Sequence, residues 1–210
     1  MRKLVSLAIC GLVALALPAV ATDLTIGLRG FTVSMGHING LIEEFEQDAE
    51  LDLSPLQAGA GIEADVGIFA MGDRGSIGFG GRGLLVRETF RDVTITASLV
   101  GLFARAEFAF GKWMAHVDAG GHRGTYSFPA ARIPGLSGWG AGLGGGVAYR
   151  LPLTERFALA LDLGLAWLPV PEMSDADGQK YRGRGTPFMD FSGISASIKL
   201  TWLVPERSNE

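Results

Sequence analysis

The sequence contains one cysteine, Cys10, among 210 residues, and this residue lies in a segment that we expect to be removed. With one thiol the chain cannot form an internal disulfide, and without Cys10 the mature part has neither a thiolate metal ligand nor a thiol nucleophile. His116 and His122 share a predicted strand but are six residues apart, which is too distant for a shared metal ion. We expect no cofactor and no bound metal.

Long hydrophobic runs are also missing. No stretch after residue 21 offers about 18 consecutive apolar residues, so the sequence predicts no transmembrane helix. The mean hydropathy is nevertheless positive, at +0.27, and 48% of the residues are hydrophobic. Hydrophobicity that is high overall but never continuous has to be distributed by alternation. A membrane-spanning β-barrel requires this distribution, because in lipid only a closed sheet satisfies all of its backbone hydrogen bonds.

The N-terminal segment has the organisation of a secretory signal peptide. Arg2 and Lys3 provide the positive charge, and an uncharged apolar core follows over residues 4–17. Ala19-Val20-Ala21 then provides a cleavage site with small residues at its first and third positions. The apolar core is shorter than the about 20 residues that a membrane-spanning helix needs. Because the core continues beyond Cys10, we do not expect a lipoprotein anchor there.

Cleavage after Ala21 would leave a barrel over residues 22–204 and a short charged tail over 205–210. The whole sequence has 18 lysines and arginines against 22 aspartates and glutamates. Loss of the two basic residues of the signal peptide leaves 16 against 22, and no basic run remains. An acidic chain of this kind gives no reason to expect nucleic-acid binding.

Eight stretches of the chain alternate apolar residues with small or polar ones. Residues 156–168 show the pattern best, with leucines, Phe157 and Trp167 on one face and alanines, Gly164 and Asp162 on the other. Side chains on a strand point alternately to opposite faces, so a period of two predicts a strand with one apolar face. The predicted strands are 23–36, 54–70, 75–89, 93–110, 113–125, 138–151, 156–169 and 188–203.

The connections between these strands alternate in length, which supports the count of eight. The connections at 71–74, 111–112 and 152–155 are tight turns. Most of the others are long and polar or rich in proline, namely 37–53, 126–137 and 170–187, whereas 90–92 is short. Short turns at one rim and longer loops at the other are typical of bacterial outer-membrane barrels, in which the short turns are periplasmic. The sequence thus predicts an all-β fold, an eight-stranded antiparallel up-and-down transmembrane β-barrel.

The composition of the second face separates a membrane barrel from a soluble one. A soluble barrel of the lipocalin kind also alternates, but its outer face is usually charged. Here the second face of strand 138–151 consists of Gly140, Gly142, Gly144, Gly146 and Ala148. Small residues suit the crowded interior of an eight-stranded barrel, which side chains fill. We therefore expect the apolar face to meet lipid, with the tryptophans near the strand ends in aromatic girdles.

Ten titratable residues fall on the small, inward face of the predicted strands. Buried charges are unfavourable unless they are paired, so a nearly balanced set predicts an internal network of salt bridges. One interpretation is that this network fills and orders the lumen, and the alternative is a gated path for small solutes or ions. The set comprises Arg29, Glu63, Asp65, Arg82, Arg105, Glu107, His116, Asp118, Asp162 and Lys199.

The predicted outer loops carry opposite charges. The first of them holds six acidic residues with almost no compensating base, and it could respond to cations, bind a partner or be simply solvated. The fourth loop offers Lys180, Arg182 and Arg184, so we expect an electrostatic contact between the two loops. Asp175-Ala176-Asp177-Gly178 resembles part of a calcium loop, but the third acid and the distal glutamate are absent. The acidic residues of the first loop are Glu43, Glu44, Glu46, Asp48, Glu50 and Asp52.

Two further patterns do not support an enzyme. Residues 78–83 and 140–145 match the glycine spacing of dinucleotide-binding sites, but neither match opens a helix. A hydrolytic barrel needs a histidine beside a serine and a carboxylate, and His122 with Ser127 and an acid from the fourth loop is a conceivable set. The His-x-Ser motif of the eight-stranded lipid A deacylases is absent. Lipid modification is therefore the weakest of the functional hypotheses.

Taken together, the signal, the eight strands, the tight turns and the filled lumen resemble the small outer-membrane barrels, the OmpA-type transmembrane domain and the OmpX/Ail-type proteins. The resemblance is architectural and rests on no sequence motif, and fold alone does not fix function. It implies an outer-membrane location, contact with outer-membrane lipid and the barrel assembly machinery, and an external partner for the long loops. The leading hypothesis is a non-enzymatic barrel with a structural or surface-interaction role, and the second is a narrow channel.

Overall fold

A computed structural model describes residues 23–35, 38–40, 56–70, 75–90, 93–128, 135–183 and 186–203 of the chain, without side chains for 68–70, 90 and 93. The predicted signal peptide and the tail over 205–210 lie outside these ranges, so neither is tested. No helix among the described residues is long and apolar enough to cross a membrane.

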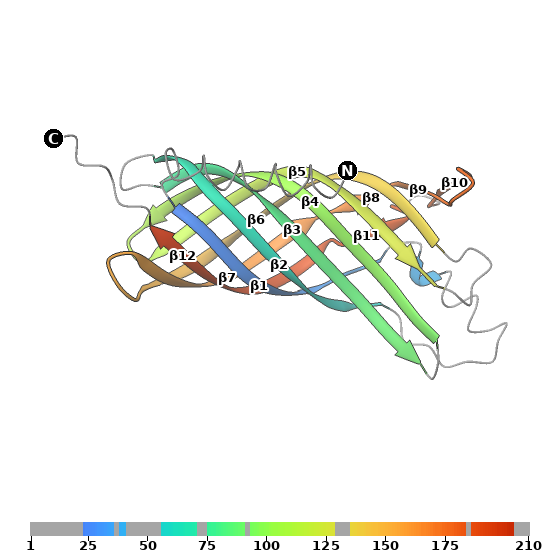
Figure 1. The fold of residues 1–210 in the computed structure, drawn as a ribbon, viewed down its shortest axis with the longest axis horizontal. Coiled ribbons are helices and arrows are strands. Elements are labelled where there is room, and N and C mark those ends of the chain that lie inside the picture. The colour runs from blue at the N-terminus through green and yellow to red at the C-terminus, as the bar shows by residue number, and fades with distance from the viewer. Residues whose placement is uncertain are drawn as a thin grey trace, which may run out of the picture.

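Eight long antiparallel strands form a closed barrel, as the alternation predicts (Figure 1). Each strand pairs with its neighbours in sequence order, and the last strand closes the ring on the first, where Asp23 pairs with Leu203. The long strands are β1 (Asp23–Thr32), β2 (Ala58–Ala70), β3 (Gly75–Phe90), β4 (Val93–Phe110), β5 (Trp113–Ser127), β6 (Gly135–Pro152), β7 (Phe157–Trp167) and β12 (Gly193–Leu203).

The connection between β7 and β12 differs from the prediction. The sequence predicts a loop over 170–187 followed by a continuous strand from 188, but the structure has four short strands there. The chain leaves the barrel wall after Trp167, and the last wall strand starts only at Gly193. We call residues 168–192 the return segment. Its strands are β8 (Pro169–Val170), β9 (Glu172–Ser174), β10 (Lys180–Arg182) and β11 (Met189–Asp190), of which β8 pairs with β11 and β9 with β10.

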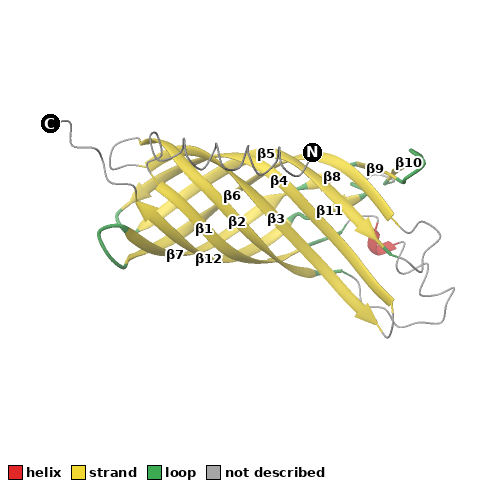
Figure 2. Cartoon of the chain, viewed as in Figure 1, coloured by secondary structure: helices red, strands yellow, loops and turns green. Residues whose placement is uncertain are grey.

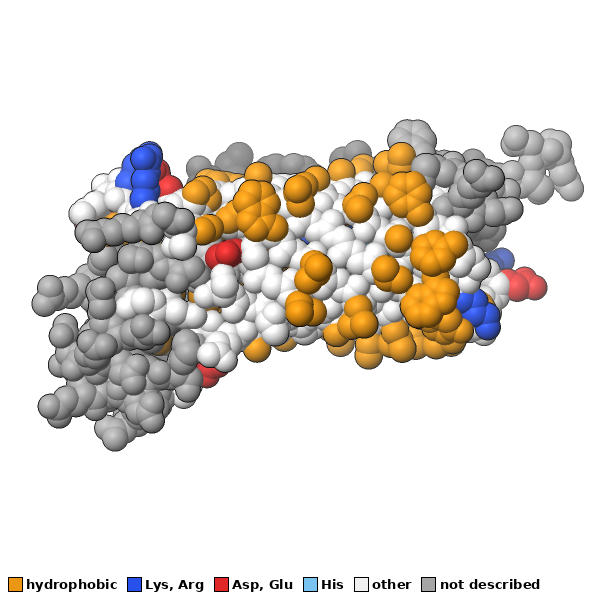
Figure 3. All heavy atoms as spheres, turned by 180° about the vertical axis from the view of Figure 1, so that it is seen from behind, with side chains coloured by type: hydrophobic (Ala, Val, Ile, Leu, Met, Phe, Trp, Pro, Cys, Tyr) orange, Lys and Arg blue, Asp and Glu red, His pale blue; other side chains and the backbone are white. Residues whose placement is uncertain are grey.

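The outward positions of the barrel are apolar. Along β1 buried and exposed residues alternate without a break, and Leu28 on its outward face is 70% exposed. On β7, Leu163 and Leu165 are 67% and 65% exposed, whereas the inward Asp162 is buried. In Figure 3, hydrophobic side chains are spread over the visible wall between white backbone and other side chains, and they are densest towards the right-hand end. A wall of this composition is stable in lipid and not in water, which confirms the expected facing.

Aromatic side chains mark the ends of this apolar wall. Trp113 and Tyr149 pair across β5 and β6 near the rim that carries the turn at 111–112, and their rings meet edge to face at 5.0 Å. Trp139 and Trp167 are exposed near the opposite ends of β6 and β7. Amphipathic rings at both ends of an apolar band are typical of membrane barrels. We call the rim with residues 111–112 the inner rim and the opposite rim the outer rim.

The lumen has two halves of different chemistry. The charged residues occupy the half next to the inner rim, and a hydrophobic core fills the half next to the outer rim. Wall strands and the return segment both contribute to this core. In Figure 2 the short strands β8, β9, β10 and β11 lie towards the right-hand end of the barrel. From the wall come Phe31, Val33, Leu84, Val86, Ile95, Ala97, Leu99, Tyr126 and Leu136, and from the return segment Leu168, Val170, Met173, Phe188, Met189 and Phe191.

Glycines on the inner face of β6 make room for the return segment. A Cβ atom on Gly138, Gly140 or Gly142 would lie 2.1, 2.0 or 2.3 Å from a backbone oxygen of residues 167–172. Contacts this short do not occur, so any side chain at these positions would push the segment away from β6. The glycines of β6 therefore allow two backbones to lie against each other, in addition to relieving crowding in the lumen.

Candidate functional site: the charge cluster in the lumen

The ten inward titratable residues predicted from the alternation are all buried in the inner half of the lumen. They come from seven of the eight wall strands, because each strand contributes the residues whose parity directs them inward. Nine of the ten take part in ion pairs with one another, and the exception is Glu107. Strand stagger decides the pairing, which the sequence alone left open.

Arg105 of β4 lies at the centre of the cluster. Its Nη2 atom is 2.7 Å from Glu63 Oε1 and 3.1 Å from Asp118 Oδ2, and its Nη1 atom is 2.8 Å from Asp65 Oδ2. One guanidinium thus joins carboxylates from β2 and β5 across the lumen. The planar fork of arginine suits this role, because its donors point in fixed and separate directions.

Glu63 of β2 is the corresponding anionic centre. Its two carboxylate oxygens face Arg29 Nη1 at 2.9 Å, Arg105 Nη2 at 2.7 Å and Lys199 Nζ at 3.2 Å. Arg29 also donates a hydrogen bond from Nη2 to Ser195 Oγ, at 2.7 Å. These contacts connect β1, β2, β4 and β12, so the network crosses the closure of the barrel between its first and last strands.

A second anionic centre lies on β7. Asp162 Oδ2 is 2.7 Å from His116 Nε2 and 3.1 Å from Lys199 Nζ. Lys199 therefore connects Asp162 with Glu63, and a continuous chain of polar contacts runs from β5 through β7 and β12 to β2. These contacts place paired charges from four strands inside the inner half of the lumen.

Two arginines share one aromatic ring at the top of the cluster. The guanidinium carbons of Arg82 and Arg105 lie 4.3 and 4.7 Å from the centre of the Phe103 ring. Arg82 also pairs with Asp118, at 2.6 Å from Nη2 to Oδ1. Cation–π contacts stabilise desolvated cations, so the buried Phe103 ring supports both guanidinium groups.

Glu107 is the member that the cluster does not bind. It is buried near the inner rim, beside Ser76 and Asp65, but makes no ion pair or hydrogen bond with the described residues. The structure therefore brings nine of the ten predicted residues into one network and leaves the tenth at its inner edge.

Several inward polar residues escaped the sequence analysis. His122 is buried on the same face of β5 as His116, and its Nε2 atom lies 2.9 Å from the carbonyl oxygen of Pro169 in the return segment. Thr25 and Thr201 meet hydroxyl to hydroxyl at 3.0 Å across the closure of the barrel. The alternation of side chains along a strand would have identified each of these residues as inward-facing. His122, for example, is six positions from His116, an even number, so the two side chains lie on the same face of β5.

The outer rim is closed by contacts to Asp190 of the return segment. Ser34 donates a hydrogen bond to Asp190 Oδ2 at 3.0 Å, and the backbone amide of Met35 donates to the Asp190 carbonyl at 2.8 Å. The backbone amide of Phe191 in turn donates to the carbonyl of Leu168 at 3.2 Å. The first two bonds fix the return segment to the chain after β1, and the third joins the two ends of the return segment.

The cations of the fourth loop bind within that loop. Lys180 and Arg182 of β10 both pair with Glu172 of β9, the first at 2.7 Å. Their hydrogen bonds hold the pKa of the Glu172 carboxyl below its ordinary value. Lys180 and Arg182 therefore already have an anionic partner within their own loop, without the predicted contact with the acidic first loop. Arg184 and the acidic residues Glu43, Glu44, Glu46, Asp48, Glu50 and Asp52 lie outside the described part of the chain.

The turn that resembles a calcium loop has a structural role. Asp175 Oδ1 accepts hydrogen bonds from the backbone amides of Asp177 and Gln179, at 3.0 and 2.9 Å, and Asp175 Oδ2 accepts one from the Tyr181 hydroxyl. Gly178 has a φ of +82°, a conformation that favours glycine. Within the described ranges, no group of three or more histidines and acids is arranged to hold a metal ion.

The pair of His122 and Ser127 does not form. His122 faces the lumen, whereas Ser127 is exposed on the outward face of β5. Residues an odd number of positions apart lie on opposite faces of a strand, so the two side chains point to opposite sides of the wall. This geometry removes the pair that the sequence analysis considered as a nucleophile with its base.

Comparisons with known proteins give architectural likenesses only. No family model matches the chain, and no curated protein matches it. Among solved structures, Neisserial surface protein A is 10% identical at a TM-score of 0.49, with 86% of this chain and 96% of that chain covered. Ail of Yersinia pestis is 10% identical at 0.46, with 86% and 95% covered. A major outer membrane protein of Thermus thermophilus is 11% identical at 0.42, with 86% and 98% covered.

The chain thus resembles small outer-membrane barrels in architecture, as the sequence analysis expects. The assignment of the fold does not depend on this likeness, because the strand pairing of the chain closes the barrel by itself. Identities near 10% carry no information about a ligand, a partner or the residues that would bind one.

Proposed function

We propose that this protein is a non-conducting outer-membrane barrel with a structural or surface-interaction role, secreted with a signal peptide that is then cleaved. The observation that supports the proposal is the burial of charged and apolar side chains of the described residues in both halves of the lumen. The charge cluster occupies the inner half and the hydrophobic core, with the return segment, occupies the outer half. A barrel built in this way presents its outer wall and its outer rim to other molecules, and not its interior.

The energetics of the charge cluster also favour a closed lumen. Buried ion pairs are weak evidence for the stability of a protein. They do hold their partners in one arrangement, because the loss of a single partner leaves an uncompensated buried charge. Arg105 and Glu63 each contact at least two opposite charges, and their side chains are only about 2% exposed. Opening a path would require several of these contacts to break at once.

The surface role rests on the outer rim. The hairpin of β9 and β10 extends from the outer end of β6, which it joins through a single residue pair, Ser137 and Ser174. It carries Glu172, Lys180 and Arg182 on exposed or half-exposed positions. In this proposal the hairpin and the long first loop contact lipid headgroups or an extracellular partner, and the barrel assembly machinery inserts the wall.

Conductance in planar lipid bilayers tests the proposal. We expect single insertions of the refolded mature protein to give no steady current step at neutral pH. The matched test is a variant shortened within the return segment, because this change removes part of the hydrophobic core and leaves the charge cluster in place. We expect this variant to give no steady current step either, because the charge cluster remains in the inner half of the lumen. A stable current step from the wild-type protein would favour the narrow channel over the structural barrel.

A further inference from the structure

A hollow in the outer wall extends across β4, β3, β2 and β1 and reaches β12 and Leu159 of β7. Its part over β3 is lined by Gly81 and Gly83, with Ala64 beside them on β2, all at outward positions. Leu28, Ile62, Val100 and Leu102 also line the hollow and are each more than 60% exposed. The strand register places Gly83 between Ile62 and Val100, and Gly81 between Ala64 and Leu102. The part of the hollow over β3 is therefore a strip of wall without side chains, between apolar side chains on β2 and β4.

Larger side chains close the strip at both ends. Phe79 and Leu85 occupy the outward positions of β3 before Gly81 and after Gly83, and they are 52% and 47% exposed. They are six positions apart, which corresponds to about 20 Å along a strand. The strip lies within the apolar wall, so the medium that fills it is the hydrocarbon of the bilayer.

Packing inside the barrel does not explain these two glycines. A Cβ atom on Gly81 would be 3.6 Å from its nearest neighbour and one on Gly83 3.8 Å, which are ordinary van der Waals distances. On the inward face of the same strand, a Cβ on Gly78 or Gly80 would instead lie 1.8 or 2.3 Å from a backbone oxygen. The inward glycines are required by the barrel, whereas the two outward ones serve only the shape of the outer wall.

A cation lies on β3 just beyond Leu85, which closes the outer end of the strip. Arg87 is the outward residue that follows Leu85 on β3, and it is exposed and makes no ion pair or hydrogen bond with a described residue. Among the described outward positions of the eight long strands, only Arg87 and Arg123 are charged. Both are cationic and both lie towards the outer rim, and Arg123 is held by Ser137 Oγ at 3.1 Å. A cation beyond an apolar strip complements an anionic headgroup on an acyl chain.

We propose that the strip over Gly81 and Gly83 is a binding site for one acyl chain of an outer-leaflet lipid whose phosphate-bearing headgroup has a net negative charge, with Arg87 as the partner of the phosphate. The chain lies between Ile62 and Val100 and contacts the bare backbone of β3. The guanidinium of Arg87 meets the phosphate with paired donors, and a headgroup that also carries a cation, such as choline, offsets part of this attraction.

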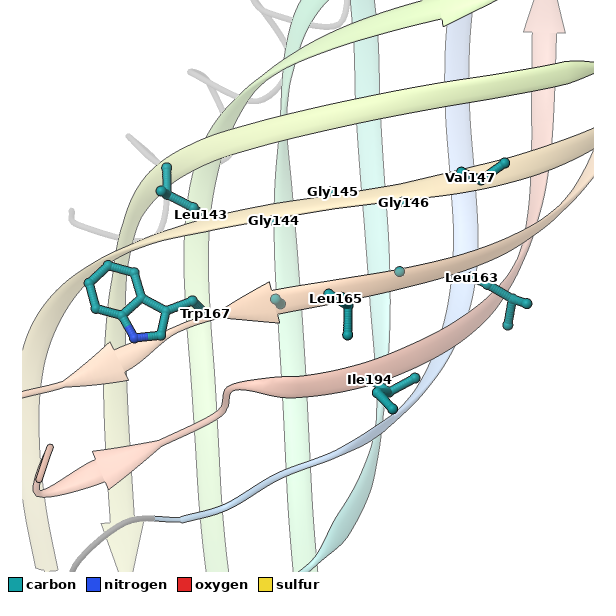
Figure 4. Close-up of a pocket in the computed structure, with 11 residues that line it drawn as sticks. Leu143, Gly144, Gly145, Gly146, Val147, Leu163, Leu165, Trp167 and Ile194 are labelled. Carbon is teal, nitrogen blue, oxygen red and sulfur yellow. The ribbon is translucent and has the colours of Figure 1, made fainter.

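A second hollow in the wall serves as an internal comparison (Figure 4). It lies over Gly145, and Leu143, Val147, Leu163, Leu165, Trp167 and Ile194 surround it. A Cβ on Gly145 would be 3.0 Å from the carbonyl oxygen of His116, so this glycine is constrained by packing. No charged residue occupies the described outward positions of β6, β7 or β12. This hollow lacks the cation, and we assign no headgroup preference to it.

The experiment is native mass spectrometry of the full mature chain, released from nanodiscs that contain equal amounts of phosphatidylglycerol and phosphatidylcholine. We expect the wild-type barrel to retain one phosphatidylglycerol in preference to phosphatidylcholine. Arg87→Gln should reduce that preference about fivefold, and Arg87→Lys should keep most of it. Gly81→Leu combined with Gly83→Leu fills the strip and should reduce the retention of both lipids.

Ala119→Leu is the matched control for added bulk, since Ala119 is an exposed outward residue of β5 away from the strip. It should leave retention unchanged. Faster migration of unheated samples on gels verifies that each variant is folded, and the exposed Arg87→Gln change keeps the test available if the glycine variant does not fold. The proposal is wrong if the Arg87→Gln barrel keeps the wild-type preference, or if the filled strip retains lipid as well as the Ala119→Leu control does.

Discussion

Arg105 and Glu63, from strands β4 and β2, lie 2.7 Å apart in the middle of the barrel, and neither side chain is more than about 2% exposed. Each of them also binds other charges, so the pair joins two groups of ions into one network. The contact depends on β3, which lies between the two strands in the wall and whose register with both sets the level at which the two side chains meet.

Removal of one member of this pair should destabilise the barrel. We expect Arg105→Ala or Glu63→Ala to lower the free energy of unfolding by about 3–5 kcal/mol, because each change leaves a buried charge uncompensated. Urea titration of the protein in lipid vesicles, followed by tryptophan fluorescence, measures the effect. Arg156→Ala is the control, since Arg156 is exposed in the turn before β7. Equal stability of all three variants would mean that water, and not the network, solvates the lumen.

The apolar wall predicts a dependence on depth. Leu161 lies on the outward face of β7, within the wall, and Leu161→Arg should cost about 2–4 kcal/mol of unfolding free energy, as charges in the bilayer midplane do. Leu153 is also exposed but lies in the turn at the inner rim, where an arginine should cost about 0–1 kcal/mol. The same urea titration compares the two variants. A larger loss at Leu153 would contradict the assignment of the wall to lipid.

The glycine contacts of β6 predict what holds the return segment in place. A Cβ on Gly140 would lie 2.0 Å from the Pro169 carbonyl oxygen and 2.5 Å from His122 Nε2. Gly140→Val should therefore displace residues 168–192 and cost about 1–3 kcal/mol through overpacking. Limited proteolysis in micelles should cut this segment faster than in the wild type. Gly121→Val is the control, because a Cβ there is 3.9 Å from its nearest neighbour, and it should leave the cleavage rate unchanged.

The β9–β10 hairpin should respond to acid. Hydrogen bonds from Lys180 and Arg182 lower the pKa of Glu172, so this carboxylate stabilises the hairpin at neutral pH. That contribution is complete above the ordinary glutamate pKa and is lost as the pH falls through the lowered value, because protonation removes the charge that both cations bind. The amide chemical shift of Tyr181 should follow this transition as the solution is acidified from neutral pH. In Glu172→Gln the corresponding shift should be absent.

Alternation along the chain was sufficient for the architecture and for the composition of the cluster. A period of two assigns each residue of a strand to one face, and lipid imposes apolar residues on the outer face, so parity alone placed Arg29, Asp118 and Lys199 inside the barrel. The same rule would have included His122. Glycine and turn residues located the tight connections of the inner rim, such as Gly111 with its φ of +67°.

The tertiary structure decided which charges meet and how the outer half is closed. Pairing in the lumen depends on the register of several strands: β2, β3 and β4 together bring Glu63 to Arg105, and Lys199 of β12 reaches Glu63 only once the ring is closed. The sequence predicts a loop for most of the return segment because this stretch has no clear period. The segment folds inward because the apolar residues of the wall near the outer rim, such as Val86 and Leu99, need hydrophobic partners, and Phe188 and Met189 can reach them only across the barrel.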